Sequence, residues 1–159
     1  MDTQTFEQDL KTLVFRVGKE HYGIHINQVV SIERMQSITP YPNRPPYVLG
    51  VTTVREEVIP VVDLCAALTG ESFQHEASSR IIIVQVYGNA IGLLVDAATD
   101  VLDIAADIIQ KPNLFETREV TYLKGIAKQE ERLLILLDIE KLLEDTTNLD
   151  DLKEIKNYL

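Results

Sequence analysis

The sequence predicts an all-β protein with short helices, built as two small β-barrels side by side and followed by a C-terminal helix. Three observations support this prediction. Apolar residues alternate with other residues over short segments, as at Leu13, Phe15 and Val17, which is typical of half-buried strands. Turn residues separate these segments, and the same order of elements occurs twice along the chain. About five short strands per repeat have too many turns for one flat sheet, and curling each set into a barrel removes exposed edges.

The first hairpin is predicted over residues 12–26, with Gly18, Lys19 and Glu20 between its two apolar runs. Asn27 is a good N-cap residue and is expected to begin one helical turn within residues 27–32. Four prolines then fall between positions 40 and 46. Because proline lacks the backbone N–H and restricts the residue before it, this segment is predicted to be a stiff loop.

A second hairpin pairs residues 48–54 with residues 58–64 around the charged tip at 55–57. Pro60 is expected to place the second of these strands at a sheet edge or a bulge. A short helix at 64–68 and a polar connection up to Ser79 complete the first half.

The second half repeats this order under two shifts, one of 69 residues and one of 75. The equivalent positions include Phe15 and Val84, Gly23 and Gly92, Ile32 and Val101, Gly50 and Gly125, and Asp63 and Asp138. A barrel of about 60 residues buries little core, so each lobe is expected to need its twin for stability.

The chain is therefore expected to contain a flexible N-terminus at residues 1–11 and a single domain at 12–147. Its subdomains are placed at about 12–70 and 79–143, with the possibility that the first strand crosses over. Residues 148–159 are predicted to form a C-terminal helix, because its apolar residues are three or four positions apart. Its apolar stripe either packs on the barrels or binds a partner.

Composition excludes several classes of protein. The 159 residues include 15 Lys and Arg against 25 Asp and Glu, and the net charge of -10 disfavours nucleic acid and anionic membranes as partners. The longest weakly polar stretch, 81–95, has 15 residues and is too short to span a bilayer as a helix. No export signal follows Met1, and the single cysteine excludes an internal disulfide, so a cytoplasmic protein is expected.

No residue pattern indicates a metal, a cofactor or a nucleophile. His21 and His25 lie in a strand, where four residues span about 13 Å, and His75 stands alone in a polar segment. Cys65 has no basic neighbour and is expected to be a buried structural thiol. No nucleotide-binding loop occurs.

Two sets of aspartates remain. The series Asp96, Asp100, Asp103 and Asp107 is expected to form a solvated acidic face. Asp63 and Asp138 most simply cap the short helices that follow them. The alternative is a small hydrolase that uses these two carboxylates, and it requires that they share a cleft.

Arg55 stands where the second half has Glu130. An arginine on a hairpin tip presents a five-donor fork on an apolar stem, which suits a protein interface. The alternative is an exposed ion pair with Glu56 or Glu57.

Several segments, in order and spacing, resemble the CheW-like domain of bacterial chemotaxis, over about residues 13–143. The segments are Phe15-Arg-Val-Gly-Lys-Glu-His-Tyr-Gly-Ile-His-Ile, Ser31-Ile-Glu-Arg-Met, Tyr47-Val-Leu-Gly-Val, and Arg55 followed by Val58-Ile-Pro-Val-Val-Asp-Leu. The resemblance implies two SH3-like five-stranded barrels in a stand-alone, non-enzymatic adaptor. Such an adaptor couples chemoreceptor cytoplasmic tips to the regulatory domain of the histidine kinase CheA, and is recruited from the cytoplasm to membrane-bound receptor arrays.

The resemblance places receptor-binding residues mainly on the first lobe and assigns no kinase-binding residues. The receptor-binding residues it implies are Val30, Ser31, Glu33, Gly50, Arg55 and Val101. Where the family usually has Asn-Leu-Arg-Gly, this chain has Thr53-Val-Arg-Glu, and Glu56 adds a negative charge beside Arg55. This departure leaves an alternative open, in which an orphan CheW-like scaffold or kinase-titrating module serves another two-component pathway.

Overall fold

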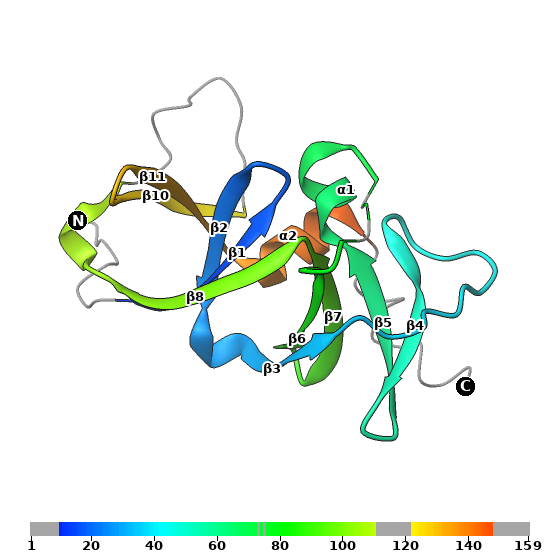
Figure 1. The fold of residues 1–159 in the computed structure, drawn as a ribbon. Helices are drawn as coiled ribbons and strands as arrows, with labels where there is room; N and C mark the ends of the chain where they lie inside the picture. Colours follow the sequence, from blue (N-terminus) through cyan, green and yellow to red (C-terminus); the bar gives the residue numbers. More distant parts are fainter. Residues whose placement is uncertain (1–9, 73, 75, 111–121, 148–159) are drawn as a thin grey trace.

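The computed structural model describes residues 10–72, 74, 76–110 and 122–147 (Figure 1). The predictions for residues 1–9, for His75 and for the helix at 148–159 lie outside the described residues. The elements of the first half are β1 (Leu10–Val17), β2 (Glu20–His25), the 3₁₀ turn η1 (Ile26–Gln28), β3 (Val29–Arg34), β4 (Val48–Val54), β5 (Glu57–Asp63) and α1 (Leu64–Thr69). Those of the second half are β6 (Arg80–Val86), β7 (Asn89–Val95), β8 (Ala97–Ile104), η2 (Ala106–Ile108), β9 (Ile109–Gln110), β10 (Leu123–Gln129), β11 (Arg132–Leu137) and α2 (Ile139–Thr146).

The described strands form two sheets, which confirms the predicted all-β class with short helices. The six-stranded lobe has the order β8-β1-β2-β11-β10-β9, and the five-stranded lobe has the order β3-β6-β7-β5-β4. Each half of the chain therefore gives its first hairpin to the lobe built mainly by the other half. The contiguous subdomains expected at 12–70 and 79–143 are corrected accordingly, because both strands of the hairpin β1–β2 cross over.

The internal repeat is visible in the strand pairing. Val61 of β5 pairs in parallel with Gly92 of β7, and Leu136 of β11 pairs in parallel with Gly23 of β2. These two pairs are equivalent under the shifts found in the sequence. The β3–β6 and β8–β1 ladders are likewise interrupted at equivalent residues, Val30 and Thr99.

Both lobes bring a preceding segment back to the outer edge of a hairpin. In the five-stranded lobe Thr39 exchanges two backbone hydrogen bonds with Val51 of β4, at 2.8 and 2.9 Å. In the six-stranded lobe Gln110 of β9 pairs with Ile126 of β10 at the equivalent place. These pairings cover an edge that would otherwise be open.

Three buried clusters among the described residues explain why the two lobes form one domain. The largest, here called the central core, joins the hairpin β1–β2, through residues such as Phe15, to the hairpin β6–β7, through residues such as Ile82. A smaller cluster fills each lobe. Neighbouring residues of β1 and of β6 face different clusters, so these strands are buried on both sides. That accounts for the unbroken apolar run Ile81–Val84.

Two local predictions are corrected. The turn after β2 is η1, and its N-cap is His25, whose Nδ1 accepts a hydrogen bond from the Asn27 N–H at 3.2 Å. Asn27 therefore lies inside the turn. Pro60 does not mark an edge strand, because β5 lies between β7 and β4. Pairing with β7 begins at Val61, so Pro60 sits just outside the part of β5 that has two neighbours.

Candidate functional site

Arg55 lies in the tight turn that joins β4 to β5 in the five-stranded lobe. Arg55 and Glu56 have φ values of 50° and 71°, which are the left-handed values of a type I′ hairpin turn. Glu130 and Glu131 adopt the same conformation in the second lobe, at 51° and 72°. The turn thus forms without the glycine that the position of Glu56 would favour.

From this tip, the Arg55 side chain reaches β3. Its Nη1 lies 3.0 Å from Oε2 of Glu33 and donates to Oγ of Ser31 at 3.5 Å. The Arg55 side chain is 70% exposed, whereas that of Glu33 is only 16% exposed. Glu33 Oε2 is buried and has no hydrogen-bond partner among the described residues. Its contact with Arg55 is an ion pair that lacks hydrogen-bond geometry. Glu33 is therefore the more buried member of the ion pair and positions the arginine. Arg55 is the exposed member that a partner can contact.

An apolar row lies on the same strand. Val30 is 53% exposed and Ile32 is 43% exposed, and they alternate with the less exposed Ser31 and Glu33. Ile32 is not among the binding residues predicted from the sequence, although its place two residues after Val30 on a strand could have indicated it. The row borders the central core, because Ile32 lies opposite Ile82 in the ladder.

Val101 lies on β8, in the other lobe. It is 51% exposed and stands opposite Leu13, which belongs to the central core. Val101 is the repeat equivalent of Ile32, so both lobes present an exposed apolar side chain at this equivalent position beside the core that joins them. The strand β8 also contacts β6, the ladder neighbour of β3.

Gly50 is buried on β4, where it has a structural task. A Cβ at this position would overlap the Thr39 carbonyl oxygen, so the Thr39–Val51 bridge requires a glycine there. Gly125 allows the same approach by Gln110. Of the six predicted binding residues, the structure brings Ser31, Glu33 and Arg55 into contact, exposes Val30 and Val101 on the edge strands β3 and β8, and buries Gly50.

Comparisons with known proteins agree with this architecture. The model of the family described as "CheW-like domain" matches residues 11–147. The chain belongs to the CheW-like family. This confirms the resemblance noted in the sequence.

Relatives of similar length support the assignment. The chain is 34% identical over 132 residues to the chemotaxis protein CheW of Klebsiella aerogenes, covering 82% of this chain and 80% of that protein. It is also 34% identical to the chemotaxis protein CheW of Bacillus subtilis, covering 84% and 86% of the two chains. The crystal structure of the scaffolding protein TtCheW from Thermoanaerobacter tengcongensis superposes with a TM-score of 0.77 at 32% identity, covering 86% of this chain and 94% of that one.

The six-stranded lobe of this CheW-like domain has its own ion pair between β11 and its edge strand. Arg132 Nη2 lies 3.3 Å from Oδ2 of Asp100, and here the carboxylate side chain is the more exposed member, at 48% against 33%. Nearby, burial and the charges of Arg132 and Arg16 lower the pKa of His21. Asp100 is the repeat equivalent of Ser31, so the more exposed charge of this pair is an anion where the five-stranded lobe has a neutral hydroxyl.

Asp96 is not part of a solvated acidic face, which corrects that expectation. It is 6% exposed, and its Oδ2 accepts the Gly18 N–H at 2.5 Å. Its carbonyl accepts the Ser78 hydroxyl at 2.7 Å. The residue therefore fixes the corner between β7 and β8 against the turn of the first hairpin.

The carboxylates considered for hydrolysis act as helix caps. Asp63 Oδ1 accepts the Ala66 N–H at 3.0 Å, and Asp138 Oδ1 accepts the Lys141 N–H at 3.2 Å. Burial raises the pKa of the Cys65 thiol, which is unfavourable for a nucleophile. In the part of the chain that the structure describes, no group of His, Cys, Asp and Glu could hold a metal ion. No helix among these residues is long and apolar enough to cross a bilayer.

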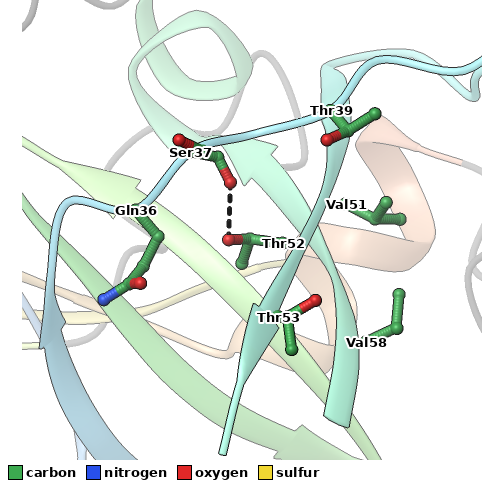
Figure 2. Close-up of a pocket in the computed structure, with 7 residues that line it drawn as sticks. All are labelled: Gln36, Ser37, Thr39, Val51, Thr52, Thr53 and Val58. Carbon is green, nitrogen blue, oxygen red and sulfur yellow. Dashed lines mark hydrogen bonds between the residues drawn. The ribbon is translucent and has the colours of Figure 1, made fainter. Parts of the chain in front are cut away.

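A surface hollow of about 450 Å³ lies between β4, the start of β5 and the segment after β3 (Figure 2). It is lined by Gln36, Ser37, Thr39, Val51, Thr52, Thr53 and Val58. Thr52 donates to the Ser37 carbonyl at 2.7 Å. This lining contains amides, hydroxyls and methyl groups but no ionisable side chain, so it offers no acid or base.

Proposed function

We propose that this CheW-like chain is a non-enzymatic adaptor that couples the cytoplasmic tips of chemoreceptors to the histidine kinase CheA, and that it is recruited from the cytoplasm to receptor arrays. The main observation in its favour is Arg55, an exposed arginine held by a nearly buried glutamate beside the apolar row of β3. Membership of a family whose relatives are named chemotaxis proteins supports the same role.

The receptor contact is proposed on the side where the two lobes meet. Val30 and Ile32 on β3, with Val101 on β8, offer exposed apolar side chains on either side of the central core. A receptor helix that buried them would gain about 25 cal/mol for each Å² of apolar surface removed from water. Arg55 would add a bidentate donor for a receptor carboxylate or carbonyl at the edge of this surface.

The kinase contact is proposed as a pairing of barrels, using a surface separate from the receptor contact, and its residues are not assigned. Each of the two interfaces can be modest, on the order of 1,000 Å² or less, because contacts repeated in an array supply avidity. Tight affinity between single pairs is not required.

Substitution of Arg55 tests the receptor contact. Arg55→Glu removes the donor fork and places a carboxylate beside Glu33, so we expect receptor binding to fall by about tenfold or more. Lys128→Glu is the matched control, because it makes the same charge change on an exposed residue of β10. Binding to a soluble chemoreceptor cytoplasmic fragment is measured by pull-down and titration, with circular dichroism to check folding. Unchanged receptor binding by a folded Arg55→Glu variant would refute the assignment.

Reconstitution tests the coupling role. CheA activity is measured with a receptor, in the presence and absence of this protein. The adaptor role predicts that kinase activity depends on both the receptor and this protein. Binding to the kinase without any receptor-dependent change would instead favour an orphan scaffold.

A further inference from the structure

The proposed receptor surface is nearly symmetric in its apolar contacts. The exposed row on β3 consists of Val30, Ile32 and Arg34, and the exposed row on β8 consists of Thr99, Val101 and Asp103. The three positions of one row are the repeat equivalents of the three in the other, and we call these six residues the seam surface. A helix lying across both rows would meet similar β-branched side chains in either direction, so apolar contacts alone cannot fix its orientation.

Charge breaks this symmetry. Arg34 ends the row on β3, and Asp103 occupies the equivalent position on β8. Arg34 lies opposite Arg80 in its ladder, which adds to its charge. Asp103 lies opposite Lys11, which partly offsets it.

The ion pairs beside the seam surface strengthen the difference. In the Arg55–Glu33 pair the exposed member is the cation, at 70%. In the Arg132–Asp100 pair the more exposed member is the anion, at 48%. The more exposed member is therefore a cation in the pair beside β3 and an anion in the pair beside β8, and Glu56 and Glu57 add exposed negative charge next to Arg55.

This inference rests on the proposed function: we propose that the reversal of charge between Arg34 and Asp103 selects the direction in which the receptor helix binds. The helix places carboxylates over Arg34 and its basic residues over Asp103. Its apolar stripe covers Ile32 and Val101 between them. Charge complementarity of this kind discriminates between orientations more than it adds affinity.

Exchanging the two end charges tests the proposal without altering the net charge. Arg34→Asp alone or Asp103→Arg alone makes both ends alike and is expected to weaken binding of a soluble chemoreceptor cytoplasmic fragment by about threefold to tenfold at low salt. The double variant Arg34→Asp with Asp103→Arg reverses the polarity of the seam surface and leaves Arg55 and Asp100 unchanged. The control exchanges Lys19 and Glu20, which are exposed on the tip of β1–β2.

Orientation is measured with the full chain, using a photo-crosslinking residue at position 56 or at position 131, which are equivalent exposed tips of the two lobes. Mass spectrometry locates the crosslinks on the receptor fragment. We expect the two sites to label opposite ends of the bound segment, and their targets to exchange in the double variant but not in the control. Targets that stay the same in a folded double variant that binds overturn the inference but leave the proposed function intact. Failure of the unmodified chain to bind the fragment overturns the proposed function, and the inference with it.

Discussion

Replacing Gly50 by alanine should destabilise the fold rather than remove a partner contact. The new Cβ would overlap the Thr39 carbonyl oxygen and lie 2.7 Å from the carbonyl carbon, so the Thr39 segment must move away. That movement breaks the two backbone hydrogen bonds between Thr39 and Val51, each contributing about 1 kcal/mol. Added to overpacking of about 1–3 kcal/mol, this gives a total cost of about 4 kcal/mol. For a chain of this size, such a loss lowers the melting temperature by roughly 8–16 °C.

Thermal and urea unfolding followed by circular dichroism measure this effect, with Gly88→Ala as the control. Gly88 has a φ of 81°, and a Cβ added there would meet no atom within 4 Å, so only backbone strain of about 1 kcal/mol is expected. If Gly50→Ala were no less stable than Gly88→Ala, the closure of the five-stranded lobe by Thr39 would be wrong. A Gly50→Ala chain of full stability that fails to bind receptor would restore Gly50 as a contact residue.

Three further predictions concern the core and its titrating groups. Phe15→Ala removes a fully buried ring that stacks on Tyr22, and should lower the free energy of unfolding by about 3–5 kcal/mol. Both lobes should still unfold in one transition, and separate transitions for the two lobes would contradict the shared central core. Because burial raises the pKa of Cys65, a disulfide reagent should label the folded chain at neutral pH far more slowly than the chain in urea, and equal rates would contradict this. The pKa of His21 is lowered in the folded state, so the unfolded chain takes up this proton first as the pH falls below 6.5. Stability should therefore decline on acidification, and His21→Gln should make the urea midpoint less dependent on pH.

The predictions that succeeded rest on local patterns. The hairpins, the short helices and the caps at Asp63 and Asp138 follow from alternation, turn residues and the preference of aspartate for the N-cap. The Asn27 prediction failed locally, because His25 caps the turn instead, whereas the prediction for Asp96 failed because of a distant partner. In the sequence Asp96 resembles the other carboxylates of its series, but it is buried because the turn at Gly18, 78 positions away in the chain, offers it a backbone N–H.

The sequence predicted the candidate site only in part, because contacts between residues distant in sequence decide the roles of Arg55 and Gly50. Arg55 stands out because its repeat equivalent is Glu130, but nothing local indicates that its counter-ion is Glu33. Gly50 matches the family pattern at a binding position, yet its neighbour across the strand is the backbone of Thr39.

The sequence by itself determined the class of fold, the duplication and the family, because strand periodicity, turn chemistry and spacing are properties of nearby residues. The tertiary structure alone decided that each half lends its first hairpin to the other lobe. The two halves have nearly the same pattern, so pairing within a half and pairing between halves satisfy the same local preferences. The exchanged arrangement places both faces of β1 and of β6 against apolar neighbours and so builds the central core.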